Sequence, residues 1–224
     1  MQQRALYARY LADARATIES DSSEKSRFRV LAALTRLRQI CCDPRLVDDS
    51  STPSAKFELV LELLQECVEE EHRVLLFSQF TSMLDLLEAR LDEIGMRHCR
   101  LDGGTRDRQG EVRRFTTDPG IPVFLISLKA GGHGLNLTQA DTVILYDPWW
   151  NPAVEDQAAA RAHRMGQTVP VHVHKLVVAG TVEEKMMELQ ARKRELAESV
   201  IEGSDEDGLG GLDLETLRAL VLDS

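Results

Sequence analysis

Short continuous apolar runs alternate with longer amphipathic stretches through the middle of this chain. The apolar runs lie at residues 73–77, 98–101, 123–127, 142–147 and 171–178. Uninterrupted runs of this length are typical of strands that are covered on both faces, and the stretches between them have helical spacing. Strand and helix in alternation predict an α/β fold, with a parallel sheet and helices on both of its faces.

Helical patterns flank this alternating region on both sides. We predict a helical extension, a main α/β domain, a long helix, and an acidic Gly-rich linker with a short closing helix, at residues 1–50, 54–182, 183–202 and 203–224 respectively. The linker contains G-S-D-E-D-G-L-G-G, a flexible composition. The closing helix has an apolar stripe that can dock on this chain or on a protein partner.

Composition favours a soluble globular protein: 43% of the 224 residues are hydrophobic. No apolar run approaches the length of about 20 residues that a membrane span needs, so no membrane partner is expected. The net charge of −10 argues against contact with nucleic acid. However, residues 183–224 carry −7 of it, which leaves −3 for residues 1–182 and allows a local basic surface.

A cluster of polar residues follows the fourth predicted strand, in E-D-Q-A-A-A-R-A-H-R-M-G-Q. On a helix, Gln157, Arg161 and Arg164 lie at i, i+4 and i+7 and share one face. Two fork-shaped, permanently charged guanidiniums on one face suit the oxygens of a phosphoryl group. The alternative is a solvated basic edge on a surface helix.

Five motifs together resemble the C-terminal half of the helicase motifs of Swi/Snf-type ATPases. They are F-S-Q-F-T-S-M-L, R-L-D-G-G-T, S-L-K-A-G-G-H-G-L-N-L, Y-D-P-W-W-N-P and the arginine motif above. The terminal Gln167 favours this family over the DEAD-box RNA helicases, which carry Arg there. The resemblance covers about residues 30–200 and implies a RecA-like lobe of a superfamily-two DNA translocase.

In this family ATP lies between two RecA-like lobes of one polypeptide. The first lobe supplies the phosphate-binding loop and holds magnesium, and this chain contains neither G-x-x-x-x-G-K-[ST] nor an acidic D-E-x-H run. The resemblance therefore implies a fragment of a longer protein that hydrolyses no ATP alone. The implied partners are the first lobe and double-stranded DNA.

The resemblance also implies roles for individual residues. Arg161 and Arg164 would stabilise charge on the γ-phosphate of ATP, with Gln157 beside them. The residues implied to approach the nucleotide sugar are Gly134 and Asn136. The residues implied to face the DNA backbone are Lys129 and Trp150. Ser78 and Gln79, at the end of the first predicted strand, can hydrogen-bond phosphate and are also expected to bind DNA. For the two tryptophans, the alternative is a hydrophobic corner of the core.

Other readings remain open at this point. His172 and His174 have metal-compatible spacing on one strand, but with no third ligand we predict no metal site. The chain could instead be a non-catalytic protein-interaction module with a helicase-like fold, or the lobe of an RNA helicase. The style of the acidic tail suggests a bacterial source, hence a cytoplasmic, nucleoid-associated protein; a eukaryotic source would make it nuclear.

Overall fold

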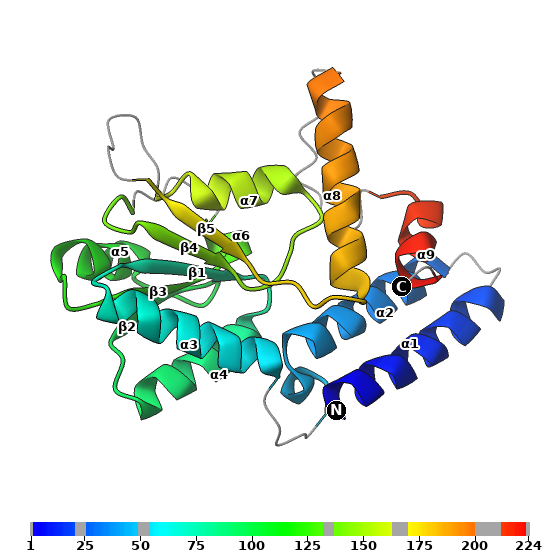
Figure 1. Ribbon diagram of the computed structural model, residues 1–224, viewed down its shortest axis with the longest axis horizontal. Helices are drawn as coiled ribbons and strands as arrows, with labels where there is room; N and C mark the ends of the chain where they lie inside the picture. The colour runs from blue at the N-terminus through cyan, green and yellow to red at the C-terminus, as the bar shows by residue number, and fades with distance from the viewer. Residues whose placement is uncertain are drawn as a thin grey trace. The chain divides into compact units, whose positions relative to one another are not determined.

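The computed structural model describes residues 2–20, 26–48, 54–131, 137–162, 170–199 and 212–222 (Figure 1). Its helices are α1 (Gln2–Ser20), α2 (Ser26–Cys42), η1 (Pro44–Leu46), α3 (Ala55–Glu69), α4 (Thr81–Glu93), α5 (Arg108–Thr117), α6 (Leu128–Gly131), α7 (Pro152–Ala159), α8 (Val182–Ser199) and α9 (Leu214–Leu222). Its strands are β1 (Val74–Ser78), β2 (His98–Leu101), β3 (Val123–Ser127), β4 (Thr142–Leu145) and β5 (His172–Lys175). Within the described residues, no helix is long and apolar enough to cross a membrane.

The chain forms two compact units. The sheet unit comprises Glu58–Asp147 and Ala153–Leu176, and the helical unit comprises Met1–Phe57, Pro148–Pro152 and Val177–Ser224.

The sheet unit contains a five-stranded parallel sheet in the order β2-β3-β1-β4-β5. All residues of β1, β3 and β4 are buried, as continuous apolar strands between two helical layers should be. In Figure 1, α3 and α4 lie on one side of the sheet and α7 on the other. The predicted α/β class is confirmed.

The strand order places a topological switch between β1 and β4. From β1 the chain runs toward β2 on one side, and from β4 it runs toward β5 on the other. Parallel α/β sheets bind their ligands beyond the carboxyl ends of strands at such a point. Ser78 ends β1 and Asp147 follows β4, so both lie at this position.

The helical unit has its own apolar core, formed by α1, α2, α8, α9 and the segment Pro148–Pro152. Its fully buried members include Leu34, Leu217 and Val221. Closing helix α9 therefore docks within this chain. Arg27 and Arg15 donate hydrogen bonds to carbonyl oxygens at its two ends, those of Leu212 (2.6 Å) and Val221 (3.4 Å).

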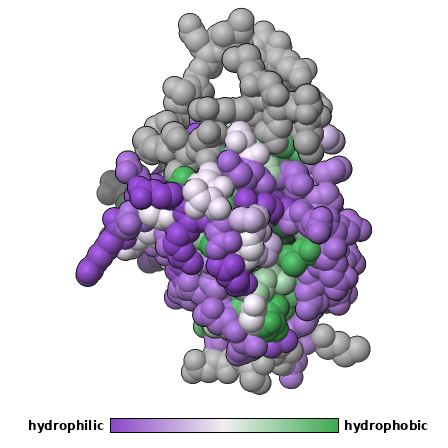
Figure 2. Space-filling model, turned by 90° about the vertical axis from the view of Figure 1, so that its left-hand side faces the viewer, coloured by the Kyte–Doolittle hydropathy of each residue, from purple (hydrophilic) through white to green (hydrophobic). Residues whose placement is uncertain are grey.

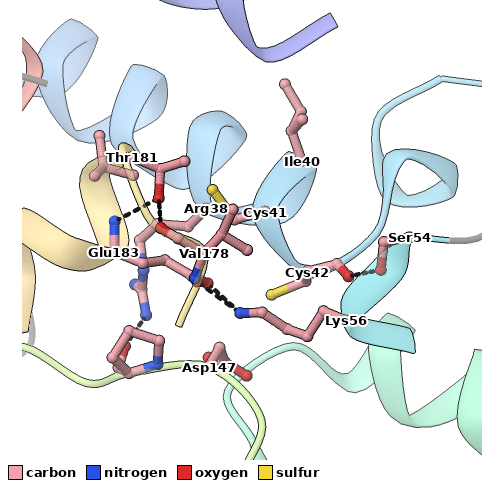
Figure 3. Close-up of polar contacts among 12 residues, drawn as sticks. Arg38, Ile40, Cys41, Cys42, Ser54, Lys56, Asp147, Val178, Thr181 and Glu183 are labelled. Carbon is pink, nitrogen blue, oxygen red and sulfur yellow. Dashed lines mark hydrogen bonds and ion pairs between the residues drawn. The ribbon is translucent and has the colours of Figure 1, made fainter. Parts of the chain in front are cut away.

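A buried ion pair joins the first turns of α3 and α8 within the helical unit (Figure 3). Lys56 Nζ lies 2.7 and 2.6 Å from the two carboxylate oxygens of Glu183, and Glu183 also accepts a hydrogen bond from the Val178 N–H at 2.9 Å. Burial lowers the pKa of Lys56, but the Glu183 carboxylate more than offsets this and raises the pKa above its ordinary value.

Candidate functional site

Hydrogen bonds tie together the ends of β1 and β4 at the switch point. Ser78 Oγ donates to Asp147 Oδ1 at 2.5 Å, and the Gln79 N–H lies 3.3 Å from both oxygens of the same carboxylate. Ser78 is fully buried and Asp147 nearly so. Ser78 is a predicted phosphate contact, but in this structure its hydroxyl bonds Asp147 and holds the ends of β1 and β4 together. Gln79 is partly exposed, but its amide nitrogen Nε2, the atom that could donate a hydrogen bond to phosphate, is buried in this structure.

The end of β3 presents the predicted DNA contact Lys129. This lysine lies on the short helix α6 directly after the strand, and its side chain is exposed. Ser127 Oγ accepts a hydrogen bond from the Ala130 N–H at 3.2 Å, and Arg108 Nη2 donates to the Ala130 carbonyl at 2.6 Å. The backbone that carries Lys129 is thus fixed from two sides while its ammonium group faces solvent.

The arginine motif is not one continuous helix face. Helix α7 ends at Ala159. Arg161 lies in the turn that follows, where its own N–H donates a hydrogen bond to the Ala158 carbonyl at 3.2 Å. The predicted i, i+4, i+7 alignment is therefore wrong for Arg161. Gln157 is exposed on α7, Arg161 is partly exposed, and Arg164 lies outside the described residues.

Two contacts within the sheet unit hold α7 and the turn after it. Glu155 of α7 is buried and forms an ion pair with Lys175 of β5. The Arg161 carbonyl accepts a hydrogen bond from the Leu137 N–H at 3.1 Å. Leu137 is the last residue of the glycine-rich motif S-L-K-A-G-G-H-G-L-N-L, so a backbone hydrogen bond joins this motif to the arginine motif.

The predicted nucleotide-sugar residues, Gly134 and Asn136, lie outside the described residues. In the described ranges, no group of three or more His, Cys, Asp or Glu side chains is placed to hold a metal ion. His172 and His174 lie on edge strand β5, where they are exposed and partly exposed.

Trp150 belongs to the core of the helical unit. It is 1% exposed and packs in the apolar cluster that includes Leu34 and Val182. Trp149 is partly exposed, with the Arg38 guanidinium carbon 5.7 Å from its ring centroid. A side chain with so little exposure cannot touch DNA in this conformation, so the hydrophobic-corner alternative describes Trp150.

A charged groove of about 910 Å³ lies beside β2 in the sheet unit; its lining includes residues of the motif R-L-D-G-G-T, to which the sequence analysis assigns no individual role. Arg100 is one of the lining residues and binds three carboxylates, with distances of 2.6 Å to Asp85, 2.6 Å to Glu88 and 2.8 Å to Asp102. Burial raises the pKa of Asp102, but the Gly104 N–H and the Arg100 guanidinium outweigh it and hold that pKa below its usual value. The sequence signal for this groove is a strand arginine that begins R-L-D-G-G-T.

Comparison with known proteins defines the class. A profile described as "Helicase conserved C-terminal domain" matches residues 55–166. The solved "Sulfolobus solfataricus SWI2/SNF2 ATPase C-terminal domain" is 31% identical with a TM-score of 0.77, over 100% of this chain and 94% of that one. A structure of the same ATPase core "in complex with dsDNA" has 32% identity and a TM-score of 0.75, over 89% of this chain and 43% of that one.

Curated relatives point the same way. "Chromatin-remodeling ATPase INO80" of Neurospora crassa is 46% identical over 170 residues, which are 75% of this chain and 8% of that protein. The protein of the same name from Candida glabrata is 45% identical over 163 residues, 72% of this chain and 11% of that protein. The chain thus spans about a tenth of the length of these curated relatives.

Fold and matches together define a helicase C-terminal lobe. The chain belongs to the Swi/Snf family of ATPases and corresponds to the C-terminal RecA-like lobe of its members. The curated relatives above come from fungi, and they do not support a bacterial setting.

Proposed function

We propose that this chain is the C-terminal half of an ATP-dependent double-stranded DNA translocase or remodeller. The first lobe of the same polypeptide would hold ATP and its magnesium. Arg161 and Arg164 would reach the γ-phosphate when the lobes close, and Lys129 would grip the DNA backbone. If the source is eukaryotic, like that of the fungal relatives, the intact protein works in the nucleus.

One observation carries this proposal: the sheet unit brings Lys129, Gln157 and Arg161 to loops and helices that follow strand ends of a single parallel sheet. Lys129 follows β3, and α7 with its turn follows β4. Ligands of such sheets bind beyond the carboxyl ends of the strands. The Leu137–Arg161 backbone hydrogen bond supports a link between the motif that contains Lys129 and the arginine motif.

Phosphoryl transfer needs positioning and charge stabilisation from the protein more than covalent chemistry. An arginine that completes the site can raise the rate by about 10³- to 10⁵-fold. Closure of the two lobes around ATP and their release after hydrolysis would move the DNA-binding loops, which gives a ratchet along the duplex. Contacts to the backbone follow the duplex without reading its sequence.

The test is ATP hydrolysis by the full-length protein, with and without duplex DNA. We expect duplex DNA to stimulate hydrolysis, Arg164→Ala to abolish it while DNA binding is retained, and Lys129→Ala to reduce the stimulation alone. The 224-residue chain by itself should hydrolyse no ATP. Stimulation by RNA in preference to duplex DNA would support an RNA helicase lobe instead.

A protein-interaction module is the other candidate. Because α9 packs in the core of the helical unit, a partner of the tail would have to bind the acidic segment 203–211. Full-length protein that binds no ATP and no DNA would favour this reading.

A further inference from the structure

Glu155 is a buried carboxylate on α7, the helix that carries Gln157 and leads to Arg161. Hydrophilic residues dominate the described part of the face shown in Figure 2, but only 1% of Glu155 is exposed. A glutamate is almost never fully buried unless it is paired. Nothing in the proposed function accounts for the burial of this one.

The partner of Glu155 is Lys175, the last residue of strand β5. Lys175 Nζ donates a hydrogen bond to Glu155 Oε2, and 25% of the lysine side chain is exposed. Lys175 lies opposite Leu145 in the parallel β4–β5 ladder, and the Leu176 N–H donates to the Leu145 carbonyl at 3.0 Å. The ammonium group is therefore anchored on the sheet, at the carboxyl ends of two of its strands.

Helix α7 depends on such an anchor, because it is short and buries little apolar surface. It contains eight residues, fewer than the about 12–15 that an isolated helix needs in water. Among its described side chains, Ala158 is the buried apolar one, and Val154 is partly exposed. An alanine removes little apolar area from water, so it leaves the helix free to slide or rotate at small cost. A charged contact with a fixed partner opposes both motions.

The segment after α7 is held by a second anchor. The Arg161 carbonyl accepts a hydrogen bond from the Leu137 N–H at 3.1 Å, and the side chains of Leu137 and Ala162 are fully buried. The helix is thus fixed near its start and just after its end. Between and at these anchors, the Gln157 side chain is exposed and that of Arg161 is partly exposed.

A buried ion pair of this kind is a weak source of stability. Taking the two charges out of water costs free energy, and replacing such a pair by apolar residues of similar volume is often neutral or stabilising. The pair supplies a defined geometry instead, because only one placement of α7 on the sheet brings Glu155 to Lys175.

We propose that Glu155 and Lys175 are positioning residues for ATP hydrolysis: their ion pair sets the place and the rotation of α7, and so aims the guanidinium of Arg161. The inference rests on the proposed function for the role of Arg161, and it adds two residues that act through that side chain. Stabilisation of a transition state needs donors that are already in place, and a misplacement of about 1 Å can cost about 10²-fold in rate. Loss of the pair should therefore lower kcat and leave the binding of ATP and DNA unchanged.

The experiment measures ATP hydrolysis by the full-length protein at saturating duplex DNA. Lys175→Met removes the ammonium group, and the Lys175→Met, Glu155→Leu double variant also removes the carboxylate that the single variant leaves unpaired. Lys185→Met is the matched control, because Lys185 forms an ion pair with exposed Glu188 at 3.3 Å. Lys175→Arg keeps the charge. Urea denaturation of each variant separates a loss of positioning from a loss of folding.

We expect the double variant to be about as stable as the wild type and to hydrolyse ATP about 10²-fold more slowly, with KM for ATP and DNA affinity within about twofold. Lys175→Arg should recover a large part of the rate that Lys175→Met loses, and Lys185→Met should lose none. In an Arg161→Ala background the double variant should lower kcat little further, because the pair acts through Arg161.

A folded double variant with a kcat near that of the Lys185→Met control overturns the positioning role and leaves the proposed function intact. Losses that add fully in the Arg161→Ala background also overturn it, because the pair would then act on another group. An unfolded double variant does so as well, since the pair would be needed for the fold itself. Wild-type full-length protein that hydrolyses no ATP in the presence of duplex DNA overturns the proposed function and this inference together.

Discussion

Replacing Arg100 by methionine should destabilise the sheet unit in a pH-dependent way. Arg100 joins α4, β2 and the turn at Asp102 through three carboxylates. The variant keeps an unbranched apolar side chain against the groove but leaves three acidic groups close together. Repulsion among them replaces three attractive contacts.

The magnitude follows from the exposure of each partner. Asp102, with 14% of its side chain exposed, makes a charge-assisted contact worth about 1.5–3 kcal/mol. Glu88 and Asp85 are 34% and 62% exposed, so each pair contributes at most about 1 kcal/mol. We therefore expect a loss of about 2–4 kcal/mol, a large share of the ~5–15 kcal/mol that stabilises a typical domain.

The sign of the pH dependence is fixed by Asp102. Its pKa is held below the usual value in the folded state, so its contribution is present above the unfolded pKa of about 3.9 and is lost as pH falls through the folded pKa. The difference between wild type and Arg100→Met should therefore be full at pH 7 and shrink below about pH 4.

Urea denaturation followed by far-ultraviolet circular dichroism at pH 7 and at pH 3 measures this difference. The control is Arg90→Met, because Arg90 and Glu93 form an exposed pair on α4 worth about 0.2–0.5 kcal/mol. A loss for Arg100→Met no larger than that of the control, or equal losses at both pH values, would refute the reasoning.

Three further predictions concern stability and are measured by the same denaturation experiment. Leu217→Ala should cost about 2–5 kcal/mol because the side chain is fully buried, and a loss near that of exposed Glu215→Ala would mean that α9 is not docked. Asp107→Ala should cost about 1 kcal/mol through loss of the α5 cap, and Asp107→Asn much less; equal losses would contradict the capping role. Lys56→Met leaves the buried Glu183 carboxylate without its ammonium partner and should cost about 3–5 kcal/mol. The Lys56→Met, Glu183→Leu double variant should lose less stability, because it buries no unpaired charge. A larger loss in the double variant than in Lys56→Met would contradict this explanation.

The sheet could be predicted from sequence because its strands are continuous apolar runs. The run at 123–127 coincides with β3, because every residue of this strand is buried and the whole strand is therefore visible as one continuous run. The prediction for the last run, 171–178, is too long, because β5 covers only His172–Lys175. Strand β5 lies at the edge of the sheet, and its residues are exposed or partly exposed. The apolar run continues past the last paired residue, Lys175, and from Val177 onward it belongs to the helical unit.

The site is harder to predict, because its geometry depends on contacts between distant residues. Periodicity places Arg161 on a helix but cannot detect that the helix ends at Ala159 and turns back. The Ser78–Asp147 bond joins residues 69 positions apart, and no local pattern announces it. The prediction for Trp150 rests on motif position, which says nothing about burial.

The Swi/Snf motifs supply what local patterns cannot. They locate Lys129 and the arginine motif at strand ends from the sequence alone, because the order of the motifs follows the order of the strands.

The most direct test of the central claim is the ATP hydrolysis rate of the full-length Arg161→Ala variant at saturating duplex DNA. If Arg161 completes a nucleotide site on the partner lobe, the rate should fall by about 10³-fold or more, with DNA affinity within about twofold of wild type and little rescue by Arg161→Lys. A near-normal rate, or a loss of DNA affinity that matches the loss of hydrolysis, would contradict the account.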